Sequence, residues 1–187
     1  KKYPVCYASH AAADGVKSII ESKNIRIENI DKIICTVPPI IASNLTFHDP
    51  QTVKEAQFSL EFSIAMIIKY GDIKLEHLSS DVIMSSDIQN LINKVKMSVG
   101  SLPKKVKSSR KVCPEWSNVE LFTRSGERHE KFVGAPLGSS INPLSGNMLY
   151  KKFNSCVKFS KINISTKSIY EKLSNIEKVK NCQELFK

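Results

Sequence analysis

The sequence predicts an α+β protein with a small sheet and packed helices, followed by helices alone. Two observations carry this prediction. Between residues 30 and 133, segments rich in β-branched or alternating residues are interspersed with segments of helical periodicity. Beyond Pro143 the turn and strand signals fade, and the remaining segments have helical spacing. We therefore expect an α+β domain over residues 1–137 and a helical segment over residues 138–187.

The first two elements follow from residue spacing and residue type. Apolar residues return at near-helical spacing between residues 9 and 23, and Ser9 is the expected N-cap of this helix. Residues 30–37 are rich in β-branched side chains and end at Pro38 and Pro39, which cannot continue a ladder. They predict a strand, followed by a loop to about Pro50.

The strongest helical pattern covers residues 52–70. Its apolar residues return every three or four positions, and Gly71 can end the helix. These apolar residues are Val53, Ala56, Leu60, Ile64, Ile67 and Ile68. We expect one helix over this segment.

The later elements follow in order. Ser85 or Ser86 can cap a helix over residues 87–95, and residues 95–99 then alternate with the period of a strand. The extended segments 119–123 and 128–133 flank the turn dipeptide Ser125-Gly126, which predicts a β-hairpin. Two more helices are expected over residues 145–157 and 165–186.

Composition excludes several classes of protein. The 187 residues suit one compact domain, or a domain with a tail. The longest apolar run, residues 62–68, is far shorter than the roughly 20 residues of a membrane span. The five cysteines lack the spacing of zinc ligands, so we expect reduced thiols, no metal and a cytoplasmic location. The absence of an initiator methionine indicates part of a longer protein.

The formal net charge of +10 favours polyanionic ligands, and both nucleic acids and small polycarboxylates satisfy that condition. The densest basic stretch has no aromatic residue to stack on bases. It consists of Lys104, Lys105, Lys107, Arg110 and Lys111. We expect a solvated loop there, and neither a nucleic acid nor a membrane as partner.

Three sequence blocks carry a resemblance to a known family. They read KKYPVCYASHAAADG over residues 1–15, EAQFSLEFSIAMIIKYGDI over residues 55–73 and NPLSGNMLYKKF over residues 142–153. The blocks have the order and the approximate spacing of the MmgE/PrpD family. The chain resembles the C-terminal portion of that family.

The resemblance implies a two-part enzyme that needs no metal or organic cofactor. A large all-helical domain is built from both ends of the chain, and a smaller α+β lid comes from the middle. On this mapping residues 1–137 are the lid and residues 138–187 return to the helical domain, whose N-terminal portion is absent here. A site between two domains cannot form from one of them, so we expect this chain to be inactive alone. We also expect a homodimer.

The reactions implied are dehydration of 2-methylcitrate, decarboxylation of cis-aconitate, and proton movement next to a carboxylate in an epimerase or isomerase. We expect a lyase of the 2-methylcitrate dehydratase type acting on a small di- or tricarboxylate. The other two reactions remain alternatives within the family. A basic binding module without catalytic activity is the alternative of another class, and the net charge is its only support.

Substrates with several carboxylates need cations, hydrogen-bond donors and a group that moves a proton. By resemblance, Lys1 is the active-site lysine of the lid and binds a substrate carboxylate. His10 is the second catalytic candidate. From the residues alone, Lys1 could be a surface charge, and His10 could face a cleft or pack locally. Gln57 and Ser59 could bind substrate through hydrogen bonds or serve packing.

Cys6 and Phe62 are substrate-binding candidates at which the chain departs from the family pattern. In the decarboxylase branch a histidine stands in place of Cys6 and a tyrosine in place of Phe62. Both departures remove polar groups, and a phenyl ring can neither donate a proton nor bind a carboxylate. They argue against decarboxylation. The other histidines match no block and are expected at the surface: His48, His77 and His129.

Overall fold

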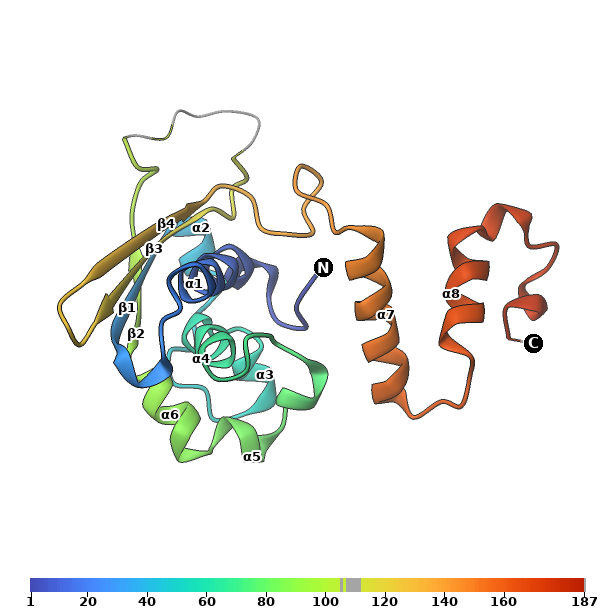
Figure 1. Ribbon diagram of the computed structural model, residues 1–187, viewed down its shortest axis with the longest axis horizontal. Coiled ribbons are helices and arrows are strands. Elements are labelled where there is room, and N and C mark those ends of the chain that lie inside the picture. The colour runs from blue at the N-terminus through green and yellow to red at the C-terminus, as the bar shows by residue number, and fades with distance from the viewer. Residues whose placement is uncertain (105, 107–111, 187) are drawn as a thin grey trace. The chain divides into compact units, whose positions relative to one another are not determined.

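A computed structural model describes residues 1–104, 106 and 112–186 of the chain. The chain forms two compact units, Lys1–Pro143 and Leu144–Lys187. The first unit contains helices packed on a four-stranded sheet, and the second contains helices (Figure 1). The chain therefore has the α+β fold class that the sequence predicts.

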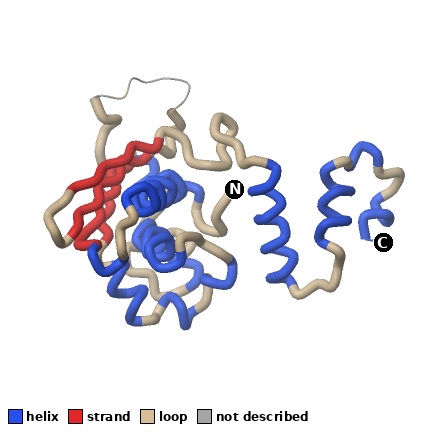
Figure 2. The backbone as a smooth tube through the Cα atoms, viewed as in Figure 1, coloured by secondary structure: helices blue, strands red, loops and turns tan. Residues whose placement is uncertain are grey.

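The sheet has the strand order β2-β1-β3-β4 and is drawn in red in Figure 2. Its strands are β1 (Ile30–Val37), β2 (Val95–Val99), β3 (Ser117–Thr123) and β4 (Arg128–Val133). β1 pairs in parallel with β2 and antiparallel with β3, and β3 pairs antiparallel with β4. The predicted strands and the predicted hairpin are confirmed. A parallel pair needs a crossover connection, which the helices between β1 and β2 supply.

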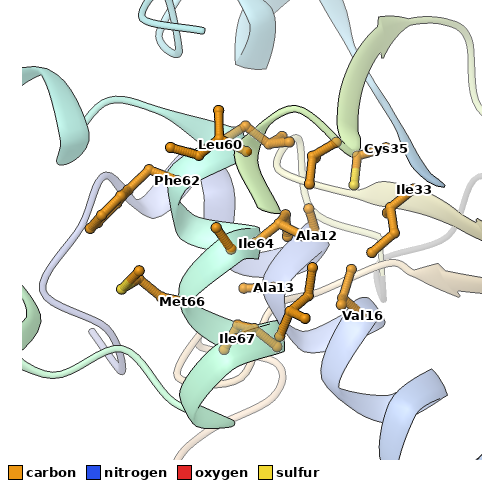
Figure 3. Packing of buried hydrophobic residues seen from close by; sticks show 14 of the residues in the cluster. Ala12, Ala13, Val16, Ile33, Cys35, Leu60, Phe62, Ile64, Met66 and Ile67 are labelled. Atoms are coloured by element: carbon orange, nitrogen blue, oxygen red, sulfur yellow. The ribbon is translucent and has the colours of Figure 1, made fainter. Parts of the chain in front are cut away.

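Helices cover one face of this sheet. They are α1 (His10–Lys23), α2 (Pro39–Ala42), α3 (Val53–Ala56), α4 (Leu60–Tyr70), α5 (Ser80–Ile83) and α6 (Ser86–Ile92), with 3-10 turns at Tyr7–Ser9, Ile27–Asn29 and Leu75–His77. α1 packs on β3 and β4, while α4 packs on α1, α6 and β2. Figure 3 shows the buried side chains that α1 and α4 contribute, Val16 and Ile64 among them, facing Ile33 and Cys35 of β1. These side chains form the core of the first unit.

α1 approaches the sheet most closely at Gly15. A Cβ atom at this position would lie 2.8 Å from Cγ2 of Val119 on β3 and 3.4 Å from Cγ2 of Val133 on β4. The first distance is too short for a real contact, and the second lies at the lower limit of an ordinary van der Waals contact. Glycine therefore permits the close packing of α1 on β3 and β4.

The prediction of one helix over residues 52–70 is wrong, because the chain leaves the helical conformation between α3 and α4. Ser59 is extended, with φ −106° and ψ 126°, and its hydroxyl accepts a hydrogen bond from the amide of Phe62 at 3.1 Å. Thr52 and Glu55 form a capping box around the start of α3. Gly71 ends α4 in the left-handed conformation, as predicted.

Smaller differences concern loops and caps. The predicted loop after β1 contains the short helix α2, with Pro39 at its first position, where proline is tolerated. Ser9 precedes α1 as predicted, but its hydroxyl donates to the carbonyl oxygen of Cys6 instead of capping the helix. Ser85 precedes α6 without a side-chain cap, and α5 was not predicted.

The second unit contains α7 (Gly146–Ser160) and α8 (Thr166–Ser174), followed by 3-10 turns at Ile176–Lys178 and Cys182–Phe186. The hydroxyls of Ser145 and Ser165 cap the two helices. The ring of Tyr170 on α8 lies 5.0 Å from that of Tyr150 on α7. No residue of α7 is buried, and α8 buries Ile169. The helical pattern of this segment is confirmed, whereas its place in a larger helical domain stays a prediction.

The loop over residues 138–143 belongs to the first unit, whereas the sequence predicts the start of the helical segment at residue 138. Within it, the amide of Gly138 donates to the carbonyl oxygen of Asn142 at 2.7 Å. The predicted basic loop falls largely outside the described residues, which include only Lys104 of its five cations. No helix in the described part of the chain is long and apolar enough to cross a membrane.

Candidate functional site

The first six residues run along the break between α3 and α4. The amide nitrogen of Cys6 lies 2.7 Å from the carbonyl oxygen of Gln57 and donates to it. The side-chain Nε2 of Gln57 donates to the carbonyl oxygen of Pro4 at 3.2 Å. Gln57 can face this segment because the helix ends at that residue. The first two sequence blocks therefore meet at the break.

A group of buried serines joins the starts of α1 and α4. The hydroxyl of Ser63 lies 2.8 Å from the carbonyl oxygen of Ser59 and 3.1 Å from the hydroxyl of Ser9. The Ser9 hydroxyl in turn donates to the carbonyl oxygen of Cys6 at 3.0 Å. These contacts satisfy polar groups that water cannot reach. They also fix the chain that leads into His10.

His10, the first residue of α1, is fully buried. Its ring centroid lies 5.0 Å from those of Tyr3 and Tyr7. Among the described residues, no side chain or backbone group meets either ring nitrogen in good hydrogen-bond geometry. Burial lowers the pKa of His10 to about 4, and the positive charge of Lys1 contributes to this decrease. The backbone of Val5 and the negative charge of Asp14 act in the opposite direction and raise this pKa. The imidazole is therefore neutral at pH 7.

Local packing, one of the two placements considered for His10, is thus the observed one. A substrate could reach its ring nitrogens only if surrounding side chains such as Tyr3 or Tyr7 moved. A catalytic role for His10 stays a prediction.

Lys1 and Lys2 have different surroundings. The ammonium of Lys2 forms an ion pair with Oδ1 of Asp14 at 3.0 Å and lies 4.4 Å from the ring centroid of Tyr3. Lys1 is exposed, and its ammonium forms no hydrogen bond or ion pair with the described residues. Its charge still acts on His10. The structure therefore brings the two catalytic candidates into one region and leaves the cation of Lys1 free for a ligand.

The four predicted substrate-binding residues divide into two groups. Cys6 and Gln57 are half-buried and contact each other through their backbones. Ser59 and Phe62 are fully buried, the first as the cap of α4 and the second in the hydrophobic core (Figure 3). A substrate contact at Ser59 or Phe62 would need a rearrangement, and for all four residues it stays a prediction.

Asp14 is a functional candidate that the sequence analysis did not select. Its Oδ1 accepts hydrogen bonds from the ammonium of Lys2 and the hydroxyl of Tyr3, both at 3.0 Å. Its Oδ2 accepts one from the amide of Leu137 at 2.7 Å. The available signal was its position at the end of the first block, one helical turn after His10.

The prediction of surface histidines is wrong for His77. This side chain is buried, stacks on the ring of Tyr70 at 4.3 Å, and accepts a hydrogen bond from the amide of Lys74. Burial lowers its pKa. His48 is exposed but pairs with the buried carboxylate of Glu61 at 2.9 Å. His129 on β4 is half-buried.

No three histidine, cysteine or acidic side chains are grouped as metal ligands within the described ranges. The site is thus a polar cluster at the start of an α+β unit that leads into a helical segment. The protein is thus of a class with two units, an α+β unit and a helical unit. Its catalytic candidates lie at the start of the α+β unit.

The comparison with protein families identifies this class. The MmgE/PrpD C-terminal domain matches residues 3–174, which is most of the chain. The chain therefore belongs to the MmgE/PrpD family and contains its C-terminal domain. The search of curated proteins gives no match. Lys1 lies outside the matched residues, so its assignment depends on the first sequence block alone.

Proposed function

We propose that this chain is the lid and C-terminal portion of a cofactor-independent lyase of the 2-methylcitrate dehydratase type. Members of the MmgE/PrpD family are generally dehydratase or lyase-type enzymes, which supports the reaction class. The observation that carries the proposal is the exposed ammonium of Lys1, which is unpaired among the described residues and whose charge acts on the buried imidazole of His10. A di- or tricarboxylate is the substrate class that such a cation can bind.

Dehydration removes a proton from a carbon next to a carboxylate and a hydroxide from the neighbouring carbon. Negative charge develops on the carboxylate side as the proton leaves, so a cation at that carboxylate stabilises the transition state. Lys1 supplies this cation in the proposal. The base and the acid that complete the reaction are expected on the helical domain that the family resemblance implies.

Epimerisation or isomerisation is the alternative within the family, because it uses the same proton removal without loss of hydroxide. Decarboxylation has less support. Phe62 replaces the tyrosine of the decarboxylase branch, and its ring lies in the core with no hydroxyl to offer. Cys6 replaces the histidine of that branch.

Substrate profiling of the complete enzyme, with its helical domain, tests the proposal. Incubation with 2-methylcitrate, citrate and cis-aconitate should give an unsaturated acid from a hydroxy acid, detected by ultraviolet absorbance and chromatography. Release of carbon dioxide would favour decarboxylation. Uptake of solvent deuterium without loss of water would favour an epimerase. If none of these occurs, the proposed class is wrong.

A basic binding module is the candidate of another class. It predicts affinity for DNA or RNA that falls steeply as salt rises, because lysine contacts to phosphate release counterions. Fluorescence anisotropy with labelled oligonucleotides at two salt concentrations measures this. We expect little specific binding.

A further inference from the structure

We propose that Asp14 is a positioning residue that holds the segment carrying Lys1 in its working conformation. This inference rests on the proposed function, in which Lys1 binds a substrate carboxylate. It follows from the three hydrogen bonds that the Asp14 carboxylate accepts. Asp14 itself points at protein groups and needs no contact with substrate.

Three donors contact the Asp14 carboxylate. An ionised carboxylate is an acceptor only, and both oxygens of Asp14 are used. Two of the donors, Lys2 and Tyr3, directly follow Lys1 in the chain. The side chain of Asp14 is only 14% exposed, so water competes little for these bonds. Releasing them would free the residues that determine where Lys1 lies.

The side chains of Lys1 and Lys2 differ in exposure. Lys2 is half-buried on Asp14, whereas Lys1 is exposed. The contact of Lys2 therefore turns the chain so that the ammonium of Lys1 stays free. Without Asp14, the two ammonium groups would be equivalent mobile charges.

Tyr3 links Asp14 to the other catalytic candidate, His10. Tyr3 donates its hydroxyl to Asp14 and places its ring edge-on against His10. Burial, together with the charge and hydrogen bond of Asp14, raises the pKa of Tyr3, so its hydroxyl keeps the proton that it donates. One carboxylate thus contacts both residues that follow Lys1, and one of them, Tyr3, packs on His10.

The bond from the amide of Leu137 anchors the loop after β4 on the same carboxylate. Tyr7 makes a second link to this loop, because its side chain hydrogen-bonds with the hydroxyl of Ser139. Burial raises the pKa of Tyr7, and this hydrogen bond partly offsets the rise. The segment with Lys1 is therefore held between α1 and this loop, and Asp14, which lies on α1, contacts both the segment and the loop.

Trypsin cleavage of the complete enzyme after Lys2 tests the holding role without any substrate. Trypsin must bind the ammonium of Lys2, and in the folded chain this ammonium is paired with Asp14. Asp14→Asn should therefore speed this cleavage about tenfold, as expected for the loss of a hydrogen bond to a charged group. Mass spectrometry measures the rate. Asp87→Asn, which removes the exposed partner of Lys69, is the matched control and should leave it unchanged.

Kinetics then test whether Asp14 acts through Lys1. In the enzyme with Lys1, Asp14→Asn should lower kcat about tenfold; in the Lys1→Ala background it should cost less than about twofold, because the group that it positions is gone. A purely structural role predicts the same loss in both backgrounds and would overturn the proposal. Unchanged cleavage after Lys2 would overturn it as well.

Two further measurements keep these outcomes separate. If Asp14→Asn fails to fold, Tyr3→Phe deletes a single hydroxyl and should give the same direction of change in both assays. If the enzyme turns over no polycarboxylate, the proposed function fails, while the cleavage rate still decides whether Asp14 holds the segment.

Discussion

The amide of Cys6 donates to the carbonyl oxygen of Gln57 over 2.7 Å, which joins two sequence blocks about fifty positions apart. The return bond from the Gln57 side chain to Pro4 makes the contact reciprocal. The first two blocks that carry the family resemblance therefore contact each other in the folded chain. Their residues can be tested as a unit.

Gln57→Ala should loosen the first segment of the chain. It leaves the carbonyl oxygen of Pro4 without its side-chain donor, which should lower the free energy of unfolding by about 1 kcal/mol. Urea denaturation measures the change. Gln51→Ala is the control, because the Gln51 side chain is exposed and bonds only to Asp49. Equal effects at the two positions would contradict the prediction.

His10 should make stability depend on pH. Its pKa is about 4 in the folded chain and 6.5 in an ordinary setting, so the unfolded state binds more protons between these values. Stability is then complete above pH 6.5 and should fall by about 3 kcal/mol as the pH drops to 4. Urea midpoints across this range measure the slope.

The variant His10→Leu should flatten most of that slope, because leucine has no proton to bind. His77, whose pKa is also lowered by burial, accounts for part of what remains. Asn44→Leu, which changes an exposed side chain without a titratable group, is the control and should keep the slope. An unchanged slope in His10→Leu would refute the assignment.

Gly15→Ala should destabilise the first unit although alanine favours helices. The gain in helix propensity is about 1 kcal/mol, while forcing a methyl group into a packed core costs roughly 1 to 3 kcal/mol. The added Cβ would lie 2.8 Å from Val119, a buried side chain with little room to move, so the cost should win. Thermal unfolding measures the difference.

Gly146→Ala is the control for this effect, since no atom lies within 4 Å of a Cβ built there. It should be neutral or slightly stabilising. A stable Gly15→Ala variant would mean that α1 can move away from the sheet at little cost.

Lys1→Ala in the complete enzyme should lower kcat/KM about ten- to a hundredfold, because a charge-assisted contact contributes roughly 1.5 to 3 kcal/mol. Lys2→Ala is unsuitable as a control, since Lys2 is paired with Asp14. The exposed Lys54 on α3 serves better. Similar small losses at Lys1 and Lys54 would mean that Lys1 is an ordinary surface charge.

Local patterns predicted the strands and most helices because their causes are local. β-branched residues and two prolines define β1, and turn residues define the hairpin of β3 and β4. The break between α3 and α4 is marked less clearly, since neither proline nor glycine interrupts residues 52–70, and Ser59, which caps α4, is a residue that also occurs inside helices. At the break Gln57 hydrogen-bonds with Pro4 and Cys6, which lie far away in the chain.

The same distinction explains the site. Lys1 and His10 could be selected because both belong to one sequence block. Asp14 belongs to that block too, but its role depends on Leu137, which lies 123 positions later. The burial of His77 depends on stacking against Tyr70, which no periodicity indicates.

The bonds of Asp14 to Tyr3 and Leu137 bring the beginning and the end of the sheet-containing unit together. A unit whose ends adjoin has the geometry of an insertion into a host protein, because it can be added or removed without separating the host's own ends. Its ends could also be joined by a short linker and the chain opened at the exposed turn of Gly126. Such a circular permutant should keep the sheet and α1 intact.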